Sequence, residues 1–284
     1  MLVSAKDMLE KARAGKYAVG HFNINNLEWA KAVLLTAEEL QSPVILGVSE
    51  GAGKYMTGFK TVAAMVSAML EELNITVPVA LHLDHGSYEG CYKCIKAGFS
   101  SIMFDGSHYP IEENVEKTKE LVKIAHTMGL SLEAEVGSIG GAEEGVVVAK
   151  DAAMYTRPED ALRFASETGV DALAVSIGTT HGQYKSKAKI NYELLAELKA
   201  KLGDTGLVLH GGTGVSDEDM RRCVREGMKK INVGTELNKS YIEVVSRTFT
   251  AEDVTPLTSL RKLLGPANDR IKEIVKEKAS LFKL

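Results

Sequence analysis

The sequence lacks the features that mark several classes of protein. Its 34 lysines and arginines stand against 38 acidic residues, so no excess of positive charge favours nucleic acid. No apolar run in it reaches the about 18 residues that a membrane-spanning helix requires. Residues 1–15 are charged and helix-like, which is unlike a signal peptide. We therefore expect neither a nucleic-acid partner nor a membrane partner.

Cysteine is scarce. The chain has 3 cysteines, and an odd number of thiols argues for a reduced, cytoplasmic protein. Cys91 and Cys94 form one CxxC pair, but no second pair accompanies them to complete a structural zinc site. A redox or metal role is therefore the weaker interpretation, and small thiols in the core or on the surface are the better one.

The sequence also has no repeat of fixed period and no GxGxxG fingerprint after its first strand-like run. What it has is an alternation of apolar runs, typical of buried parallel strands, with amphipathic helix-like stretches. Eight β–α units within about 235 residues have the length of a TIM (β/α)8 barrel. We predict this α/β fold as a single domain over residues 1–284. A doubly wound parallel sheet is the alternative, although it usually has fewer strands. The predicted strands are 17–24, 42–49, 77–84, 100–107, 131–137, 171–179, 206–213 and 229–235.

Two segments exceed what a barrel needs. Residues 137–154 form a long connection after the fifth run, and long loops in compact domains are often lids over active sites. The chain after Thr235 is helix-like, and we expect breaks near Val254 and at Gly265–Pro266. We predict extra C-terminal helices there and no second domain.

Histidines recur where the strand-like runs end. His85, His181 and His210 follow the third, sixth and seventh runs. Active groups in a TIM barrel lie at the carboxyl ends of the strands, so these three imidazoles are expected to meet. Three nitrogen ligands with one open position are typical of a catalytic zinc site. A single histidine is more often structural, so the prediction depends on all three together; His82 is expected to point into the barrel.

Carboxylates accompany the histidines. Asp84 directly precedes His85, and neighbouring side chains on a strand diverge, so Asp84 suits an acid–base role beside the metal better than a ligand role. It could instead merely orient a histidine. Glu133 and Glu135 alternate on the fifth run and face the same side, where two carboxylates need a metal, cations or hydrogen bonds. Glu135 is nearer the strand end and could be an occasional ligand.

The last two runs end in the glycine-rich sequences GGTG and NVGTE, at 211–214 and 232–236. Phosphate sites in TIM barrels are built by the loops after strands seven and eight. Glycines leave backbone N–H groups open to an anion, and Lys185 can add positive charge. Zinc, an acid–base carboxylate, a phosphate cradle and a glutamate-bearing lid together point to proton abstraction next to a carbonyl, with carbon–carbon bond making or breaking. The cradle residues that we expect are Gly211, Gly212, Thr213, Asn232, Gly234 and Thr235.

At these residues the chain resembles the class II, zinc-dependent fructose-bisphosphate aldolases, most closely the shorter subgroup that also contains the tagatose-bisphosphate aldolases. The resemblance runs almost end to end. It implies reversible cleavage of fructose 1,6-bisphosphate to dihydroxyacetone phosphate and glyceraldehyde 3-phosphate, a step of glycolysis and gluconeogenesis. Cleavage of tagatose 1,6-bisphosphate is the alternative, since the two sugars differ in one hydroxyl's configuration. The segments that carry the resemblance are FNINNLE, SPVILGVSEGAGKYM, VALHLDHGS, EAEVG, IGTTHGQYK, LVLHGGTGV and INVGTE.

The resemblance implies a metal site of known composition. His85, His181 and His210 would hold the catalytic zinc. Glu135 would be a fourth contact, or a ligand at an alternative metal position, and Asp105 would lie near that second position. Backbone oxygens near the phosphate cradle would hold a monovalent cation, K⁺ or Na⁺.

The resemblance also implies the acid–base residues. Asp84 would give a proton to the aldehyde oxygen during condensation and take it back in cleavage. Glu143 on the lid would abstract the proton from dihydroxyacetone phosphate, and Glu144 beside it is the rival. The ketone-side phosphate would be held by Gly182, Lys185, Gly211, Thr213, Asn232 and Thr235.

The far end of the substrate would meet other residues. Ser49 and Arg261 would contact the second phosphate, and Arg261 could come from a neighbouring subunit, because family members form dimers or larger assemblies. Asn23 would contact a substrate hydroxyl. We therefore expect at least a homodimer. The chain departs from the family in two places: Gly234 stands where members often have Asp or Asn, and Arg270 is shifted in the tail, so no role is assigned to it.

Three other functions compete with this one. A Schiff-base aldolase needs a lysine at the end of a barrel strand, whereas Lys229 and Lys230 are expected before the last strand, at the wrong end. A metal hydrolase often carries His-x-His on the first strand, where this chain has His21-Phe22-Asn23. A non-catalytic phosphosugar binder would have no need of Asp84 or of the lid glutamate.

Overall fold

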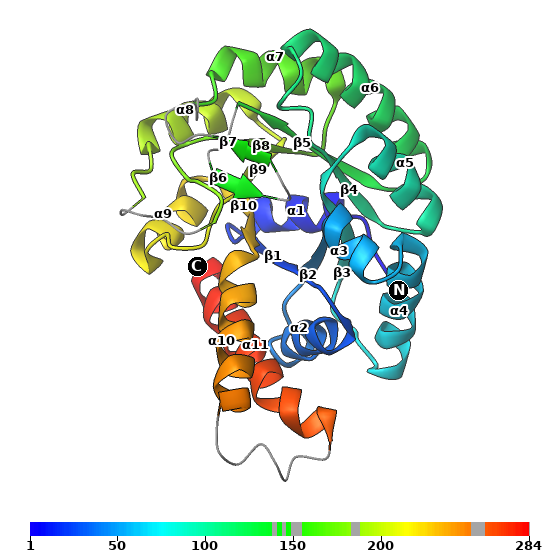
Figure 1. Cartoon of the computed structure of the whole chain (residues 1–284). Helices are drawn as coiled ribbons and strands as arrows, with labels where there is room; N and C mark the ends of the chain where they lie inside the picture. Colours follow the sequence, from blue (N-terminus) through cyan, green and yellow to red (C-terminus); the bar gives the residue numbers. More distant parts are fainter. Residues whose placement is uncertain (138–140, 144–145, 149–154, 183–187, 251–258, 284) are drawn as a thin grey trace.

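Eight parallel strands close into a barrel in the computed structural model, which describes residues 1–137, 141–143, 146–148, 155–182, 188–250 and 259–283 (Figure 1). At 141–143, 146–148 and 249–250 the backbone alone is described. Every barrel strand overlaps one predicted run, which confirms the TIM-barrel prediction. Around the barrel the strand order is β1-β10-β9-β8-β5-β4-β3-β2. The strands are β1 (Val19–Asn23), β2 (Val44–Val48), β3 (Val79–Gly86), β4 (Ser101–Phe104), β5 (Ser131–Val136), β8 (Ala172–Val175), β9 (Gly206–Leu209) and β10 (Met228–Val233).

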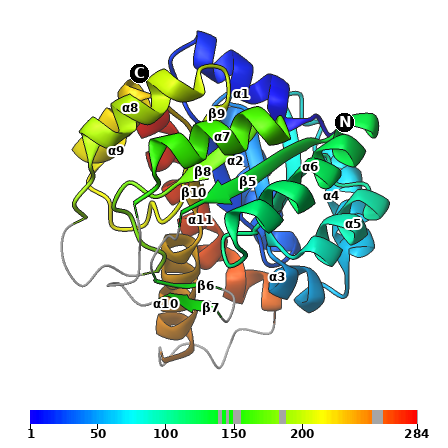
Figure 2. The ribbon, with the colours of Figure 1, turned by 90° about the horizontal axis from the view of Figure 1, so that it is seen from above.

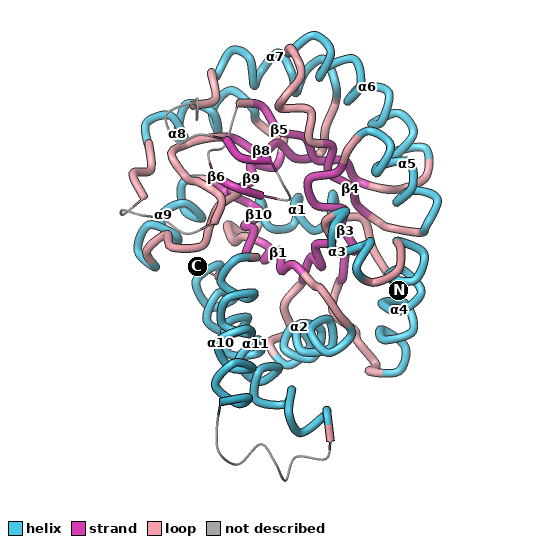
Figure 3. Tube along the Cα trace, viewed as in Figure 1, coloured by secondary structure: helices cyan, strands magenta, loops and turns pink. Residues whose placement is uncertain are grey.

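Helices alternate with these strands and surround the barrel (Figure 3). Their ends follow local sequence: Pro158 opens one helix and Gly169, in the left-handed region at φ 70°, ends it, both as predicted. The hydroxyl of Ser87 accepts the N–H of Gly90 at the start of another. Among the described residues, no helix is both long enough and apolar enough to cross a membrane. These helices are α2 (Leu27–Glu39), α3 (Glu50–Tyr55), α4 (Phe59–Glu72), α5 (Tyr88–Ala97), α6 (Ile111–Thr127), α7 (Pro158–Thr168), α8 (Tyr192–Leu202) and α9 (Asp217–Glu226).

The N-terminal helix α1 (Ala5–Ala14) closes one end of the barrel. Its buried residues Met8 and Leu9 pack against inward-facing strand residues in a core cluster separate from the larger one between strands and outer helices. Figure 2 shows α1 at the end opposite a short antiparallel hairpin, β6 (Gly141–Glu143) and β7 (Val146–Val148), which belongs to the predicted lid segment. The barrel is therefore open only at the carboxyl ends of its strands.

The C-terminal helices α10 (Thr235–Thr250) and α11 (Leu260–Phe282) form a two-helix arm that extends from the barrel beside α2 (Figure 1). The predicted break at Gly265–Pro266 is wrong, because α11 continues through both residues. Proline removes one helical N–H donor, but the preceding glycine has no Cβ to collide with the proline ring, so the helix tolerates the pair. The predicted break near Val254 falls in the undescribed stretch 251–258.

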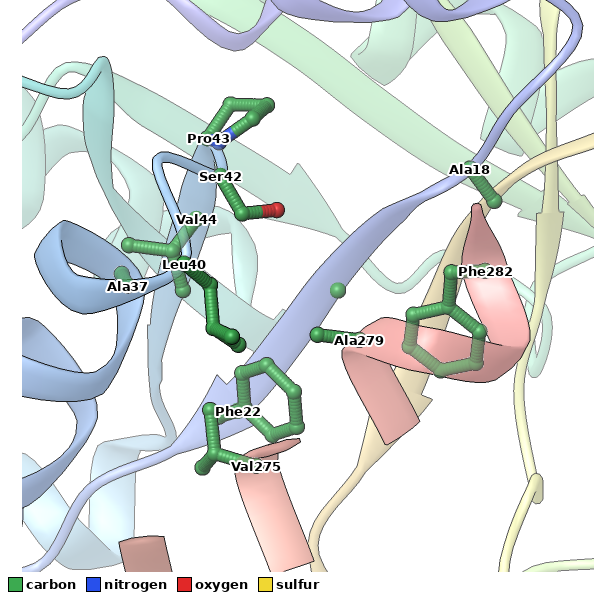
Figure 4. A pocket seen from close by; sticks show the side chains of 11 residues that line it. Ala18, Phe22, Ala37, Leu40, Ser42, Pro43, Val44, Val275, Ala279 and Phe282 are labelled. Atoms are coloured by element: carbon green, nitrogen blue, oxygen red, sulfur yellow. The ribbon is translucent and has the colours of Figure 1, made fainter. Parts of the chain in front are cut away.

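The end of α11 returns to the first barrel strand. Phe282 and Val275 lie close to Phe22 of β1 (Figure 4), and the carbonyl of Phe282 accepts the N–H of Ala18 at 3.0 Å. Gly20 makes this approach possible, because a Cβ at that position would lie 2.6 Å from the Phe22 ring and 3.2 Å from the Phe282 ring. The end of the arm is thus anchored to β1.

Glu38 on α2 connects that helix by hydrogen bonds to the segment before β3. Its carboxylate accepts the hydroxyl and N–H of Thr76, at 2.6 and 2.7 Å, and the N–H of Val77 at 3.1 Å. The Thr76 hydrogen bonds and that from Val77 lower the pKa of Glu38 from 4.5 to about 2. A lowered folded-state pKa stabilises the protein above the unfolded pKa, and this contribution disappears as pH falls toward 2.

We therefore expect Glu38→Gln to lower the melting temperature at neutral pH and to have a progressively smaller effect as pH falls from about 5 toward 2. Calorimetry at several pH values measures this directly. A loss of equal size at every pH would contradict the assignment of the stabilising effect to the ionised carboxylate.

Candidate active site and metal centre

Four potential metal ligands meet at the open end of the barrel. His85, Glu135, His181 and His210 each offer one ligand atom, and these atoms all lie within 4.8 Å of one another. The ring centroids are 4.6 Å apart for His85–His210 and 5.0 Å apart for His85–His181. The three predicted histidines therefore converge, although they come from β3 and from the segments that follow β8 and β9.

Carboxylates behind the histidines determine which ring nitrogen faces the metal position. Asp105 Oδ2 lies 2.8 Å from His85 Nδ1, and Glu133 Oε1 lies 3.0 Å from His210 Nε2. A metal would therefore be bound by the other nitrogen of each ring, the usual arrangement of a carboxylate–histidine–metal series. Asp105 thus lies behind His85 and outside the group of four, where it also accepts the N–H and hydroxyl of Ser107.

The electrostatics of the group favour a cation. Burial alone would lower the pKa of His210, but the carboxylates of Glu133 and Glu135 raise it above its ordinary value. His210 Nδ1 lies 3.4 Å from Glu135 Oε2, and among the described residues neither atom has a hydrogen-bond partner. Two buried polar atoms that face each other without a hydrogen bond are expensive unless something binds between them. A divalent metal fits this requirement.

His85 has an unusual backbone. Its φ is 47°, in the left-handed region, and the pairing of β3 with β4 shifts register between Leu83 and Gly86. Such a conformation costs a non-glycine residue of order 1–3 kcal/mol and is found mostly at functional sites. It disturbs the pairing of β3 with β4 around Asp84 and His85, and the two side chains contact different neighbours.

Asp84 is held by two side-chain amides. Asn23 Nδ2 donates to Asp84 Oδ2 at 2.8 Å, and Asn232 Nδ2 donates to Asp84 Oδ1 at 3.2 Å. Asp84 is 1% exposed and lies beside the metal ligands in sequence. Gly234 supports the arrangement, because a Cβ there would lie 2.9 Å from Asn23 Oδ1. Three of the predicted site residues are therefore in direct contact, and a larger residue at position 234 would press on Asn23.

The position predicted for Lys230 is wrong. Lys229 and Lys230 were both expected before the last strand, but both lie within β10, and Lys230 is only 1% exposed. Its ammonium lies 2.9 Å from Glu133 Oε2. Burial alone would raise the pKa of Glu133, but the charge of Lys230 and the hydrogen bond to His210 hold it well below its usual value. Lys230 is two residues before Asn232, and this spacing was the available sign that both face the interior.

A second group of potential ligands lies near the first. His21, His82 and Asp84 also bring ligand atoms within 4.8 Å of one another. Burial and the charge of Lys230 lower the pKa of both His21 and His82, so these rings are neutral. His82 is buried, as predicted. The nearby lysine opposes a metal here, and Asp84 already accepts two hydrogen bonds, so this is the weaker donor set.

The glycine-rich loops adopt conformations that suit an anion cradle. Gly182 and Gly211 have φ of 80° and 67°, which glycine adopts without strain. The hydroxyl of Thr213 accepts the N–H of Glu236 at the start of α10. Thr235 is the first residue of that helix, next to Gly234. Lys185 falls outside the described residues, so its expected contribution has no structural counterpart here.

The remaining predicted residues are farther apart. Ser49 directly follows β2 and caps α3, where its hydroxyl accepts the N–H of Ala52. Arg261 is exposed at the start of α11, which Figure 1 shows at the far end of the arm, so it does not join the site of its own chain. Glu143 is the last residue of β6, but its side chain is not described, and Glu144 falls outside the described residues.

Gly211 has a packing role in addition to the predicted anion role. A Cβ at this position would collide with the carbonyl oxygen of Thr180, the residue before His181. We therefore expect Gly211→Ala to displace His181 and to lower metal content as well as phosphate affinity. Metal analysis of the purified variant tests this. Gly214→Ala is the control, because Gly214 lies in the same loop, is exposed and has a positive φ of 87°, so an alanine there carries a similar backbone strain. Full metal content in Gly211→Ala would contradict it.

Comparisons with known proteins identify the family to which the chain belongs. The sequence profile of the family described as "Fructose-bisphosphate aldolase class-II" matches residues 3–284. A protein named fructose-bisphosphate aldolase from Geobacillus stearothermophilus is 49% identical over 275 residues, which cover 96% of this chain and 94% of that protein. A probable fructose-bisphosphate aldolase from Bacillus subtilis (strain 168) is 48% identical over 277 residues, or 96% of this chain and 95% of that one.

A solved structure is also similar. The YdjI aldolase from Escherichia coli K12 superimposes with a TM-score of 0.85 at 33% sequence identity, covering 99% of this chain and 97% of that one. The family profile, the two relatives and this structure all span nearly the whole chain. The chain therefore belongs to the class II fructose-bisphosphate aldolase family.

Proposed function

We propose that this protein is a metal-dependent aldolase, acting as a single domain over residues 1–284, that cleaves fructose 1,6-bisphosphate reversibly into dihydroxyacetone phosphate and glyceraldehyde 3-phosphate. The proposal rests chiefly on one observation: three histidines and a glutamate converge at the open end of a barrel, beside a carboxylate held by two amides. Membership of the aldolase family supports it. The reaction belongs to glycolysis and gluconeogenesis, and we place the protein in the cytoplasm.

The donor set favours zinc. Three imidazole nitrogens and one carboxylate oxygen suit Zn²⁺, and His85, His181 and His210 would hold it with Glu135 as an additional contact. When bound, the metal would polarise the ketone carbonyl of the substrate and stabilise the negative charge that develops there. Asp105 fixes the ring of His85 from behind, and we propose that it also serves an alternative metal position together with Glu135.

Two carboxylates move the protons. Asp84 gives a proton to the aldehyde oxygen during condensation and takes it back in cleavage. Asn23 and Asn232 donate to its two oxygens and so fix the carboxylate's orientation. Glu143, on the β6–β7 hairpin, removes the proton from the carbon of dihydroxyacetone phosphate; the hairpin brings this base to the mouth of the barrel only after the substrate has bound.

We expect backbone N–H groups to bind the ketone-side phosphate. The loop after β9 supplies Gly211, Gly212 and Thr213, and the end of β10 and the start of α10 supply Asn232, Gly234 and Thr235. Gly182 and Lys185 are expected to contribute as well. A monovalent cation, K⁺ or Na⁺, is bound by backbone oxygens next to this phosphate. At the other end of the substrate, Ser49 contacts the second phosphate and Asn23 contacts a hydroxyl.

An assay of cleavage on fructose 1,6-bisphosphate and on tagatose 1,6-bisphosphate, each with and without a chelator, tests the function. We expect metal-dependent cleavage with a higher kcat/KM for fructose 1,6-bisphosphate. Faster cleavage of tagatose 1,6-bisphosphate would make that sugar the preferred substrate, and the protein would still be an aldolase. Binding of both sugars without cleavage would instead identify a phosphosugar-binding protein.

We also propose that the protein is at least a homodimer, assembled through its arm. A groove of about 430 Å³ lies between α2 and α11 and is lined by Leu27, Leu35, Leu260 and Leu264. Leu260 is 66% exposed and Leu27 is 50% exposed. Exposed leucines of this kind, rimmed by charged residues, are typical of protein–protein contacts. A second copy covering this groove would bring the exposed Arg261 to its partner's phosphate site.

We expect light scattering to give a dimer or larger assembly for the unmodified protein and a lower mass for Leu260→Glu, because the glutamate would bury a charge in the contact. Met128→Glu is the control: Met128 is 61% exposed and lies at the end of α6, away from the arm. A monomeric unmodified protein would rule out the dimer, and Arg261 would then have no site to reach.

A further inference from the structure

A continuous series of buried polar contacts connects a metal ligand to the acid–base carboxylate. Glu133 Oε1 is 3.0 Å from His210 Nε2 and 3.1 Å from Lys230 Nζ. Lys230 Nζ also donates to Asn232 Oδ1 at 2.8 Å, and Asn232 Nδ2 donates to Asp84 Oδ1 at 3.2 Å. All five residues are at most 8% exposed. Lys230 is the central member of this series, and the proposed reaction gives it no role.

Lys230 determines which way the Asn232 amide points. An ammonium group can only donate hydrogen bonds and a carboxylate can only accept them. With its oxygen toward Lys230 and its nitrogen toward Asp84, Asn232 satisfies both neighbours. The flipped amide would direct N–H groups at the ammonium and its oxygen at the carboxylate, and both contacts would be repulsive in a buried environment. Without Lys230 this preference would be much weaker.

The same ammonium keeps Glu133 available for His210. Glu133 is 2% exposed, and a buried carboxylate requires a positive partner. Lys230 supplies that charge at 2.9 Å. Lys230 therefore contacts both Asn232, which holds Asp84, and Glu133, which holds His210.

We propose that Lys230 is a positioning residue that aligns Asp84 with the metal site, acting on Asp84 through Asn232 and on His210 through Glu133. The proposal rests on the roles proposed above for Asp84 and His210. It deepens the proposed function, since it explains how the carboxylate that moves a proton is held at a fixed orientation relative to the metal ligands.

The experiment separates the contact of Lys230 with Asn232 from its contact with Glu133. Removing Lys230 alone would leave the Glu133 charge buried and unpaired, which destabilises proteins strongly. The double variant E133Q/K230M removes both charges, and the introduced glutamine can still accept a hydrogen bond from His210. Glu133→Gln alone retains the contact of Lys230 with Asn232 and is the matched reference. It leaves the Lys230 ammonium buried without its carboxylate, so the unmodified protein replaces it as the reference if thermal unfolding shows that it does not fold. Lys229→Met is a second control, because Lys229 lies 3.4 Å from the carbonyl of Tyr17 and outside the series.

Each variant is assayed for thermal unfolding, metal content, cleavage of fructose 1,6-bisphosphate, and exchange of the proton of dihydroxyacetone phosphate with solvent. Exchange alone does not need Asp84, so the ratio of cleavage to exchange reports on its alignment. We expect E133Q/K230M to fold, to retain its metal, and to lose this ratio by a factor on the order of 10 to 100, as for loss of a hydrogen bond to a charged group. The ratio should stay within about threefold in Glu133→Gln and in Lys229→Met, since both keep the donor to Asn232.

Equal losses of cleavage and exchange in E133Q/K230M, or no loss, would overturn the proposal and leave Lys230 a structural residue. If that variant does not fold, E133Q/K230Q provides the second test, because a glutamine in place of Lys230 keeps a donor for Asn232. Its ratio should match that of Glu133→Gln, and a ratio as low as that of Asn232→Leu would overturn the proposal. An unmodified protein with neither activity would refute the proposed function itself, and with it this inference.

Discussion

Replacing Glu143 by alanine is expected to lower turnover by a factor on the order of 100 to 10,000, the range for a positioned acid–base group. Metal content and affinity for dihydroxyacetone phosphate should change little. The reason is that Glu143 belongs to the β6–β7 hairpin, whereas the four candidate ligands lie at the open end of the barrel. Its contribution is needed only once the substrate is bound and water is excluded. Proton exchange of dihydroxyacetone phosphate with solvent should slow by the same factor as cleavage.

Two further variants make this result specific. Asp84→Asn should impair cleavage far more than proton exchange, since Asp84 acts on the aldehyde half of the reaction. Glu144→Ala tests the neighbouring carboxylate and should be close to normal in both assays. Normal exchange in Glu143→Ala would show that another residue is the base, and Glu144 would then be the first replacement and Glu135 the second.

Loss of the metal should have an effect of similar size. We expect chelation to abolish cleavage and to leave the circular dichroism spectrum nearly unchanged, because the ligands lie at the strand ends whereas the barrel interior is packed by a separate apolar cluster under α1. Melting temperature should fall modestly, as for any protein that loses a ligand of its folded state. Added Zn²⁺ should restore activity.

His181→Ala is the best single substitution for this test. His210 is fully buried and bonded to Glu133, so its removal would disturb a buried charge as well as the metal. His181 is partly exposed, so its loss should act mainly on the metal. We expect activity to fall at least about 100-fold, since even residues behind the ligands alter metal affinity by about 10–100-fold. Stoichiometric metal with full activity in His181→Ala would remove this residue from the site.

The barrel and the metal group were predictable from the sequence because both depend on patterns that the chain repeats. Each strand is an apolar run ended by polar residues, and parallel strands bring those residues to one end. The convergence of His85, His181 and His210 follows from this alone. The residues that hold these histidines in place were harder to predict. Nothing in the local sequence indicates that Asp105 faces the ring of His85, because that contact depends on the register between β3 and β4.

Two predictions about the positions of residues within strands and helices were wrong. Lys230 was expected before the last strand although the predicted run 229–235 already contained it, and its position two residues before Asn232 on β10 turns its side chain inward. Gly265–Pro266 was expected to end a helix, but a proline preceded by glycine is tolerated in its interior. Strand and helix limits depend on hydrogen bonds with distant segments, so one sequence cannot fix them to the residue.

The joining of the chain's two ends has a consequence for its biosynthesis. Strand β1 pairs with β10, α1 packs beneath β9 and β10, and Ala18 bonds to Phe282. A ribosome that adds about 5–20 residues per second would release the N-terminal segment roughly 10 to 50 s before its partners exist. During that interval the apolar faces of α1 and β1 stay uncovered on the nascent polypeptide. We expect this segment to be the main early target for chaperones, and truncation near the C-terminus to yield aggregation-prone chains.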